Sequence, residues 1–106
     1  MSQEIRYPLP LDAPNRASLR KLGQKLRPTV MIGKAGVTDE VVDSLERNLA
    51  ANQLVKIRLQ REAPTERDAA VAVLCERTGA ECPGQIGHTF LLYRPKADGT
   101  SPDADS

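Results

Sequence analysis

A lysine stands between two glycines in the stretch Gly33-Lys34-Ala35-Gly36, which follows the apolar run Val30-Met31-Ile32. Backbone amides around paired glycines can approach a phosphate closely, because no side chain blocks them. Lys34 would add a mobile positive charge, and a helix starting at Thr38 would add free N–H groups. KH domains clamp a nucleic-acid backbone with a G-x-x-G loop of this kind. The loop is therefore a candidate phosphate-binding site.

The same loop also has a plainer interpretation, because glycines most often mark only a turn. Asp39 and Glu40 follow it and argue against a phosphate close to the helix start, since like charges repel. Nucleotide hydrolysis is a poor interpretation, because a Walker loop requires G-x-x-x-x-G-K-[ST] and the sequence contains no such motif. Taken alone, the loop leaves both a simple connector and a phosphate site open.

Three helices and four strands are predicted to position this loop. The leucines at 19, 22 and 26 recur at helical spacing, and Pro28 ends that pattern. Thr38 is a good N-cap for the second helix, and Gly79 is a typical residue to end the third. The predicted helices run from Asp12 or Asn15 to Pro28, from Thr38 to Asn52, and from Pro64 or Thr65 to Gly79.

The clearest strand signal is the alternation in Leu54–Gln60. Val55, Ile57 and Leu59 point to one face, and the polar residues between them point to the other. A strand covered on both faces would be continuously apolar, so we expect helices on one face of the sheet only. The other predicted strands are Thr29–Ile32, a weak strand at Gln85-Ile86 after the break Cys82-Pro83-Gly84, and Thr89–Tyr93.

The element order is therefore α-β-α-β-α-β-β. Strands separated by helices favour parallel pairing, whereas the last two, joined by the turn Gly87-His88, are expected to be antiparallel neighbours. The predicted fold class is an α/β two-layer sandwich with a mixed four-stranded sheet. A chain of 106 residues suits one such domain.

Basic residues are unevenly distributed along the chain. Residues 16–61 hold ten Lys or Arg but only four Asp or Glu, and the segment from Ala97 onward has three aspartates and no base. This asymmetry predicts a basic surface on the folded part and an anionic partner, although an ordinary solvated face is the alternative. No apolar run approaches a membrane span and the N-terminus lacks a secretory signal, so we expect a cytoplasmic protein without membrane contact.

The sequence offers little for catalysis or metal binding. His88 has no nucleophile or acid beside it in sequence, and we interpret it as a turn residue or at most a polar RNA contact. Cys75 and Cys82 lack the spacing of a metal site or disulfide framework and are interpreted as ordinary thiols. Glu62, Glu66, Asp68 and Glu76 read as a solvated helix face. We therefore expect no enzyme activity, metal, cofactor or small-molecule substrate.

Several short motifs of the chain occur together in one known family. They are Leu26-Arg27-Pro28, Gly33-Lys34-Ala35-Gly36, Leu54-Val55-Lys56, Thr78-Gly79, Gln85-Ile86-Gly87 and Leu92-Tyr93-Arg94-Pro95. In this combination, residues 12–96 resemble the CRM domain (chloroplast RNA splicing and ribosome maturation) in its single-domain bacterial form, the YhbY proteins. Residues 1–11, expected to be a flexible arm, and 97–106, expected to be a disordered acidic tail, lie outside the resemblance.

The resemblance implies a fold similar to the C-terminal domain of translation initiation factor three. It also implies binding to ribosomal RNA in precursors of the large ribosomal subunit, with a role in assembly, by a protein that we expect to be a monomer when free. The alternative is a protein–protein adaptor of the translation machinery that uses the same basic face. The predicted RNA-binding residues are Gly33, Lys34, Ala35, Gly36, Arg20, Lys21, Lys25, Arg27, Lys56, Arg58 and Arg94. Tyr93 could stack on a base, but a strand-end tyrosine more often packs.

Overall fold

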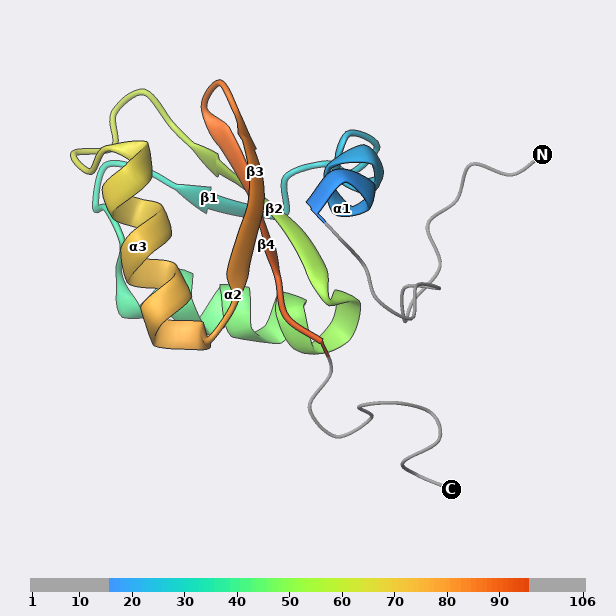
Figure 1. Ribbon diagram of the computed structural model, residues 1–106. Coiled ribbons are helices and arrows are strands. Elements are labelled where there is room, and N and C mark those ends of the chain that lie inside the picture. Colours follow the sequence, from blue (N-terminus) through green and yellow to red (C-terminus); the bar gives the residue numbers. More distant parts are fainter. Residues whose placement is uncertain (1–15, 96–106) are drawn as a thin grey trace.

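Residues 16–95 of the chain are described by a computed structural model, in which three helices surround a four-stranded sheet (Figure 1). The predicted order of helices and strands is confirmed. The elements are α1 (Arg16–Gly23), β1 (Val30–Ile32), α2 (Asp39–Asn52), β2 (Leu54–Leu59), α3 (Arg67–Thr78), β3 (Glu81–Ile86) and β4 (Thr89–Tyr93). The predicted arm (1–11) and tail (97–106) lie outside the described residues.

The sheet is mixed, as predicted, with the strand order β1-β2-β4-β3. Strands β1 and β2 are parallel and pair Val30 with Ile57. Strand β4 lies between β2 and β3 and is antiparallel to both, so the expected antiparallel pairing of the last two strands is confirmed. The parallel pair places the end of β1, where the glycine loop begins, beside the end of β2.

The main core lies between the sheet and the helices α2 and α3. Leu45 and Leu49 of α2 and Leu74 of α3 are fully buried against Ile57 and Phe90 of the sheet. The predicted alternation in β2 is confirmed, because Val55, Ile57 and Leu59 all belong to this cluster. We call this side of the sheet the inner face and the opposite side the outer face.

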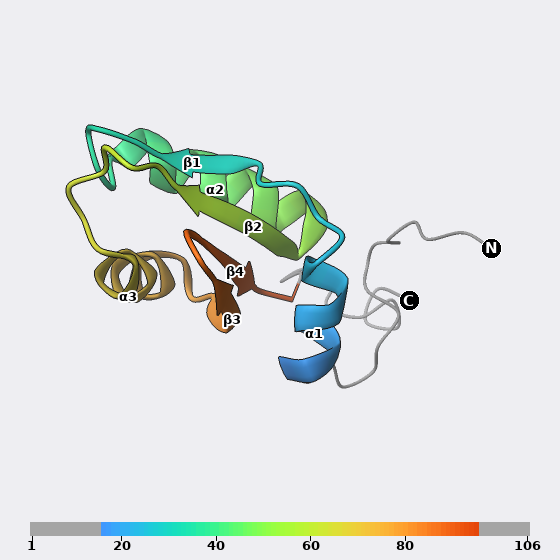
Figure 2. The ribbon, with the colours of Figure 1, turned by 90° about the horizontal axis from the view of Figure 1, so that it is seen from above.

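The expectation that all helices share one face is wrong for α1, which packs on the outer face. Leu19 of α1 forms a second buried cluster with Leu54 and Leu91. In Figures 1 and 2, α1 and α3 lie on opposite sides of β3 and β4. Gly23 permits this approach, because a Cβ atom there would lie 2.3 Å from a methyl carbon of Leu91. The continuous run of buried residues Phe90–Leu92 is typical of a strand covered on both faces.

Helix α1 also ends at Gly23 and not at Pro28 as predicted. Glycine is a poor helix former, and the chain beyond it continues as two tight turns. In these turns the Lys25 amide donates to the Leu22 carbonyl and the Leu26 amide donates to the Gly23 carbonyl, each at 3.1 Å. Leu26 still packs against the buried cluster of Leu19, Leu54 and Leu91, which we call the outer cluster. The spacing of Leu26 from Leu19 and Leu22 therefore reflects burial and does not indicate a helix that extends this far.

Strand β3 is longer than the predicted Gln85-Ile86, since it begins at Glu81 and runs through Pro83. It is an edge strand, where proline is tolerated because one row of amides has no partner strand. Its register with β4 shifts between Glu81 and Gly84. The Cys82-Pro83-Gly84 stretch therefore shifts the register of β3 and does not end the strand.

Candidate functional site

The loop between β1 and α2 is a tight turn. The Gly36 amide donates to the Gly33 carbonyl at 2.9 Å, and Gly36 has a φ of +78°, a conformation that favours glycine. Lys34 and Ala35 are exposed between the two glycines. The loop therefore presents its backbone and one lysine side chain to solvent.

The first turn of α2, directly behind the loop, is already capped and acidic. The Thr38 hydroxyl accepts a hydrogen bond from the Val41 amide at 3.2 Å. Asp39 forms an exposed ion pair with Arg77 at 3.4 Å, and Glu40 is exposed beside it. A phosphate bound here would be repelled by these carboxylates. Attraction of an anion to this loop must therefore come from Lys34 and the turn more than from the helix end.

The segment that follows β2 lies directly beside the glycine loop (Figures 1 and 2). The Gln60 amide donates to the Ile32 carbonyl at 2.9 Å, which continues the parallel pairing past the strand ends. The Gln60 side chain covers Gly33 so closely that a Cβ atom there would lie 2.9 Å from its Oε1 atom. A side chain at Gly33 would displace the tip of the Gln60 side chain, whereas the positive φ favours a glycine at Gly36.

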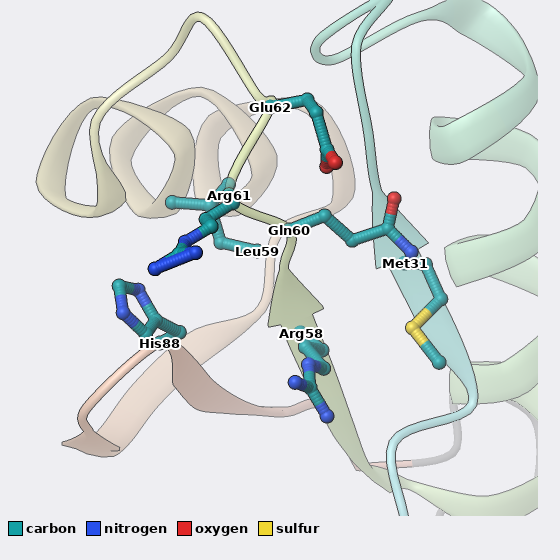
Figure 3. A pocket seen from close by; sticks show the side chains of 7 residues that line it. All are labelled: Met31, Arg58, Leu59, Gln60, Arg61, Glu62 and His88. Atoms are coloured by element: carbon teal, nitrogen blue, oxygen red, sulfur yellow. The ribbon is translucent and has the colours of Figure 1, made fainter.

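The β3–β4 turn reaches the same end of the sheet. The Leu59 amide donates to the His88 carbonyl at 2.7 Å, and the Arg67 guanidinium donates to the Gly87 carbonyl. The first bond fixes the turn against the end of β2, and the second connects it with the start of α3. As a result, the exposed His88 side chain lies near Arg61, although the two are distant in sequence (Figure 3).

Strand β1, the end of β2 with the segment that follows it, and the β3–β4 turn border an open groove of about 570 Å³, which we call the outer groove. Its lining residues are Met31, Arg58, Leu59, Gln60, Arg61, Glu62 and His88. In Figure 3, the Arg61 side chain extends toward His88, while Gln60 extends across toward β1. The lining carries two arginines against one acid, Glu62, so the groove is suited to an anionic partner.

Comparison with known protein families gives one match that covers most of the chain. Residues 11–94 match the CRS1 / YhbY (CRM) domain. The chain belongs to this family. The resemblance inferred from the short motifs is thereby confirmed.

Bacterial relatives of this CRM domain carry names that refer to RNA. A Pseudomonas aeruginosa protein named as a probable RNA-binding protein is 28% identical over 79 residues, which are 74% of this chain and 76% of that protein. A Haemophilus influenzae protein named as an RNA-binding protein is 27% identical over 88 residues, 83% of this chain and 89% of the relative. The solution structure of a Staphylococcus aureus protein has the same fold, with a TM-score of 0.67 at 24% identity, and covers 76% of this chain and 83% of its own.

Arg20 and Lys56, which were predicted to bind RNA in the CRM domain, have hydrogen-bond partners on the outer face. Arg20 donates to the Pro83 carbonyl at 3.2 Å, and its aliphatic stem lies against Gly84. Lys56 is half-buried, and its ammonium donates to the Leu26 carbonyl at 3.3 Å. Both residues hold α1 and the segment after it to the outer face. Part of the predicted open basic face of β2 is therefore covered, whereas Arg58 remains exposed.

The other predicted bases near α1 are exposed. Lys21 lies on α1, Lys25 lies in the turns that follow it, and Arg27 lies just beyond these turns. They share the outer side of the sheet with Arg58, because α1 packs there. These three bases extend the positively charged surface beyond the outer groove.

Arg94 follows β4 at the end of the sheet opposite the glycine loop, and its side chain is hydrogen-bonded to other residues there. Its Nη1 atom contacts a Glu46 carboxylate oxygen at 3.0 Å and the Thr78 carbonyl at 2.8 Å. These bonds connect the end of β4 with α2 and the end of α3. The structure therefore does not bring Arg94 together with the other predicted site residues, and it indicates a structural role.

Replacing Arg94 by alanine should lower the free energy of unfolding while leaving RNA affinity unchanged. Loss of two charge-assisted hydrogen bonds, one to a half-exposed carboxylate, should cost about 1–2 kcal/mol. Urea unfolding measures the cost, and a binding titration of the folded variant measures affinity. If the variant keeps wild-type stability but binds RNA more weakly, Arg94 contributes to RNA binding and not to stability.

Tyr93 and the two cysteines are packing residues. Tyr93 lies against the outer cluster of Leu19, Leu54 and Leu91, and burial together with the nearby Glu81 carboxylate raises its pKa. Burial, followed by the charges of Cys82 and Glu81, raises the pKa of the Cys75 thiol. A raised pKa keeps that thiol protonated and a weak nucleophile, which agrees with its interpretation as an ordinary thiol. Neither cysteine forms a disulfide.

Among residues 16–95, no cluster of three or more His, Cys, Asp or Glu side chains could hold a metal ion. Within the same residues, no helix is long and apolar enough to cross a membrane.

Of the seven residues that line the outer groove, only Arg58 was predicted as a site residue; the other six are Met31, Leu59, Gln60, Arg61, Glu62 and His88. Arg61 was counted only as part of the basic stretch, and His88 was interpreted as a turn residue or at most a polar RNA contact. The signal that could have placed them is the parallel pairing of β1 with β2, which sets Met31 beside Arg58. The position of His88 follows from the β2–β4 pairing, which brings the β3–β4 turn to the end of β2.

Proposed function

We propose that this CRM-domain protein binds RNA, without catalysing a reaction, through the Gly33–Gly36 loop and the neighbouring arginines of the outer groove. One observation carries the proposal. The Gln60 amide donates a hydrogen bond to the Ile32 carbonyl, which holds the end of β2 beside the start of the glycine loop. As a result, the exposed side chains of Lys34, Arg58 and Arg61 lie at the same end of the sheet. Family membership and the names of the relatives in Pseudomonas aeruginosa and Haemophilus influenzae support RNA as the anion.

In this proposal, phosphate contacts supply most of the affinity. Lys34 acts as a mobile point charge at the tip of the loop, and Arg58 and Arg61 can each bind a phosphate through two parallel N–H groups. Each neutralised phosphate releases counterions, so binding should weaken steeply as salt is raised. Contacts of this kind fix the orientation of the RNA but carry little sequence information.

The proposed partner is ribosomal RNA in precursors of the large ribosomal subunit, and the proposed place of action is the cytoplasm. The support for this finer assignment is the resemblance to the single-domain bacterial form of the family. In this role the protein would assist assembly by binding and orienting RNA, which requires no cofactor. The monomeric state proposed for the free protein suits a factor that occupies its RNA temporarily.

A salt titration tests the proposal against the protein–protein adaptor. The intact protein is titrated with fragments of large-subunit ribosomal RNA, with an unrelated folded RNA of equal length, and with poly-glutamate as an acidic polypeptide. We expect tight, strongly salt-dependent binding to RNA and a preference for the large-subunit fragments. Binding of poly-glutamate as tight as that of RNA would favour the adaptor. Equal binding to all RNAs would retain RNA binding but contradict the ribosomal assignment.

A further inference from the structure

Helix α1 covers only part of the outer face of the sheet. The covered part comprises Leu54 and Leu91, which pack against Leu19. Nearer the glycine loop, the pairing registers align one outward residue from each strand in a row across the sheet: Met31, Arg58, Thr89 and Ile86. Met31 is 46% exposed and Ile86 is 55% exposed, so two of the three large exposed hydrophobic residues in the described chain lie in this row.

The outer groove lies over the β1–β2 end of this row, and its lining suits a nucleotide base. Met31 offers an apolar, polarisable surface for the flat face of a ring. The guanidinium groups of Arg58 and Arg61 and the imidazole of His88 can stack on bases. Gln60 supplies an amide that can both donate and accept at a base edge. Phosphate binding alone would not require the exposed methionine.

The groove and the glycine loop are contiguous, because Gln60 belongs to both. Its side chain covers Gly33 on one side and lines the groove on the other (Figure 3). An RNA strand whose phosphate lies against Lys34 therefore has the groove within reach of its adjacent base. A base held in a duplex keeps its edges paired and its faces stacked, so only an unpaired base can enter.

We propose that the outer groove receives an unpaired base of the RNA strand whose backbone lies on the Gly33–Gly36 loop. The protein would accordingly select single-stranded segments, such as loops, bulges or ends. This inference rests on the proposed RNA binding and adds to it the strand state that the site accepts. The two arginines against one acid favour a polyanion over an apolar protein segment as the occupant.

The test compares three probes of equal length: a single-stranded oligoribonucleotide, a chain of abasic sugar–phosphate units, and an RNA duplex. The abasic chain retains the phosphates but offers nothing to the groove. The proteins compared are wild type, Met31→Ala, Gln60→Ala, Lys34→Ala and the control Val73→Ala. Val73 is an exposed apolar residue of α3 and lines no part of the groove. A thermal melt confirms that each variant is folded.

We expect wild type and Val73→Ala to bind the single strand about fivefold or more tightly than the abasic chain or the duplex, as contact with one base supplies. Met31→Ala should reduce this preference while leaving affinity for the abasic chain unchanged. Gln60→Ala, whose side chain also covers Gly33, should weaken binding of the single strand by a larger factor than binding of the abasic chain. Lys34→Ala should weaken binding of both single-stranded probes by the same factor.

Two results would overturn the inference while leaving RNA binding intact. One is equal wild-type affinity for the single strand and the abasic chain, or for the single strand and the duplex. The other is a loss of affinity in folded Met31→Ala and Gln60→Ala that is equal for both single-stranded probes. Absence of wild-type binding to all three probes would instead contradict the proposed function itself, and the inference with it.

Discussion

Ile57→Asp should lower the free energy of unfolding by several kcal/mol. Ile57 has no exposed surface, and it pairs with Val30 on one side and Phe90 on the other in the middle of the sheet. An aspartate there either buries an unpaired carboxylate or must be protonated to enter the core, and either costs several kcal/mol. Small domains are stable by only about 5–15 kcal/mol, so a loss of this size removes much of the total.

Arg58→Asp is the matched control for this variant, because it places the same residue one position along the same strand. Arg58 is exposed on the outer face, where a carboxylate remains hydrated, and its cost should stay within about 1 kcal/mol. Urea unfolding followed by circular dichroism measures both variants. Equal stability of the two proteins would show that the strand does not present Ile57 to the core as described.

Gly36→Asp should reduce RNA affinity strongly, by about tenfold or more at low salt. A Cβ atom at Gly36 would lie 3.5 Å from Pro64 and Thr65, which is an ordinary contact, so the neighbouring loop leaves room for the first atom of a side chain. It would place a negative charge at the base of the proposed phosphate site, close enough to repel the RNA backbone. Because this repulsion is screened by ions, the loss should shrink as salt is raised.

Gly36→Asn separates charge from shape in this experiment. Asparagine is nearly isosteric with aspartate, and both tolerate the positive φ of +78° better than other side chains do. Both variants should therefore lose a similar amount of stability, about 1 kcal/mol. Binding titrations at low and high salt then compare the two. If folded Gly36→Asp and Gly36→Asn bind RNA equally at low salt, no phosphate lies near this loop.

Local features of the fold could be predicted from the sequence where a single residue determines the backbone. Thr38 caps α2 as expected, and Gly79 ends α3 in the left-handed conformation with a φ of +76°. The alternation of β2 correctly predicted which side chains enter the core. These successes share a cause, since capping, turn formation and strand periodicity depend on near neighbours in the chain.

The position of α1 could not be predicted in the same way, because it depends on contacts between distant segments. The outer face of β2 is polar over most of its length, and only the pairing of β2 with β4 brings Leu54 and Leu91 together under Leu19. The roles of the arginines have the same origin. Nothing near Arg94 in sequence indicates that its guanidinium will donate hydrogen bonds to the Glu46 carboxylate and the Thr78 carbonyl.

The glycine loop was recognised as a candidate site from its own residues, but the groove beside it was not. The groove requires the parallel pairing of β1 with β2 and the return of the β3–β4 turn to the same end of the sheet. Periodicity reports which face a residue lies on but not which strands become neighbours. For this reason Arg58 was predicted as a site residue, whereas the position of Gln60 and His88 in the same groove was not predicted.

The measurement that tests phosphate binding by the loop most directly is the salt dependence of RNA affinity for wild type and Lys34→Ala. Arg47→Ala, which removes an exposed charge of the same sign from α2, serves as the control. Loss of one phosphate contact should weaken binding by a similar factor for RNAs of different sequence. It should also make the slope of log affinity against log salt shallower by about one unit. The control should keep the wild-type slope. A folded Lys34→Ala protein with wild-type affinity and an unchanged slope would show that the paired glycines form only the turn between a strand and a helix.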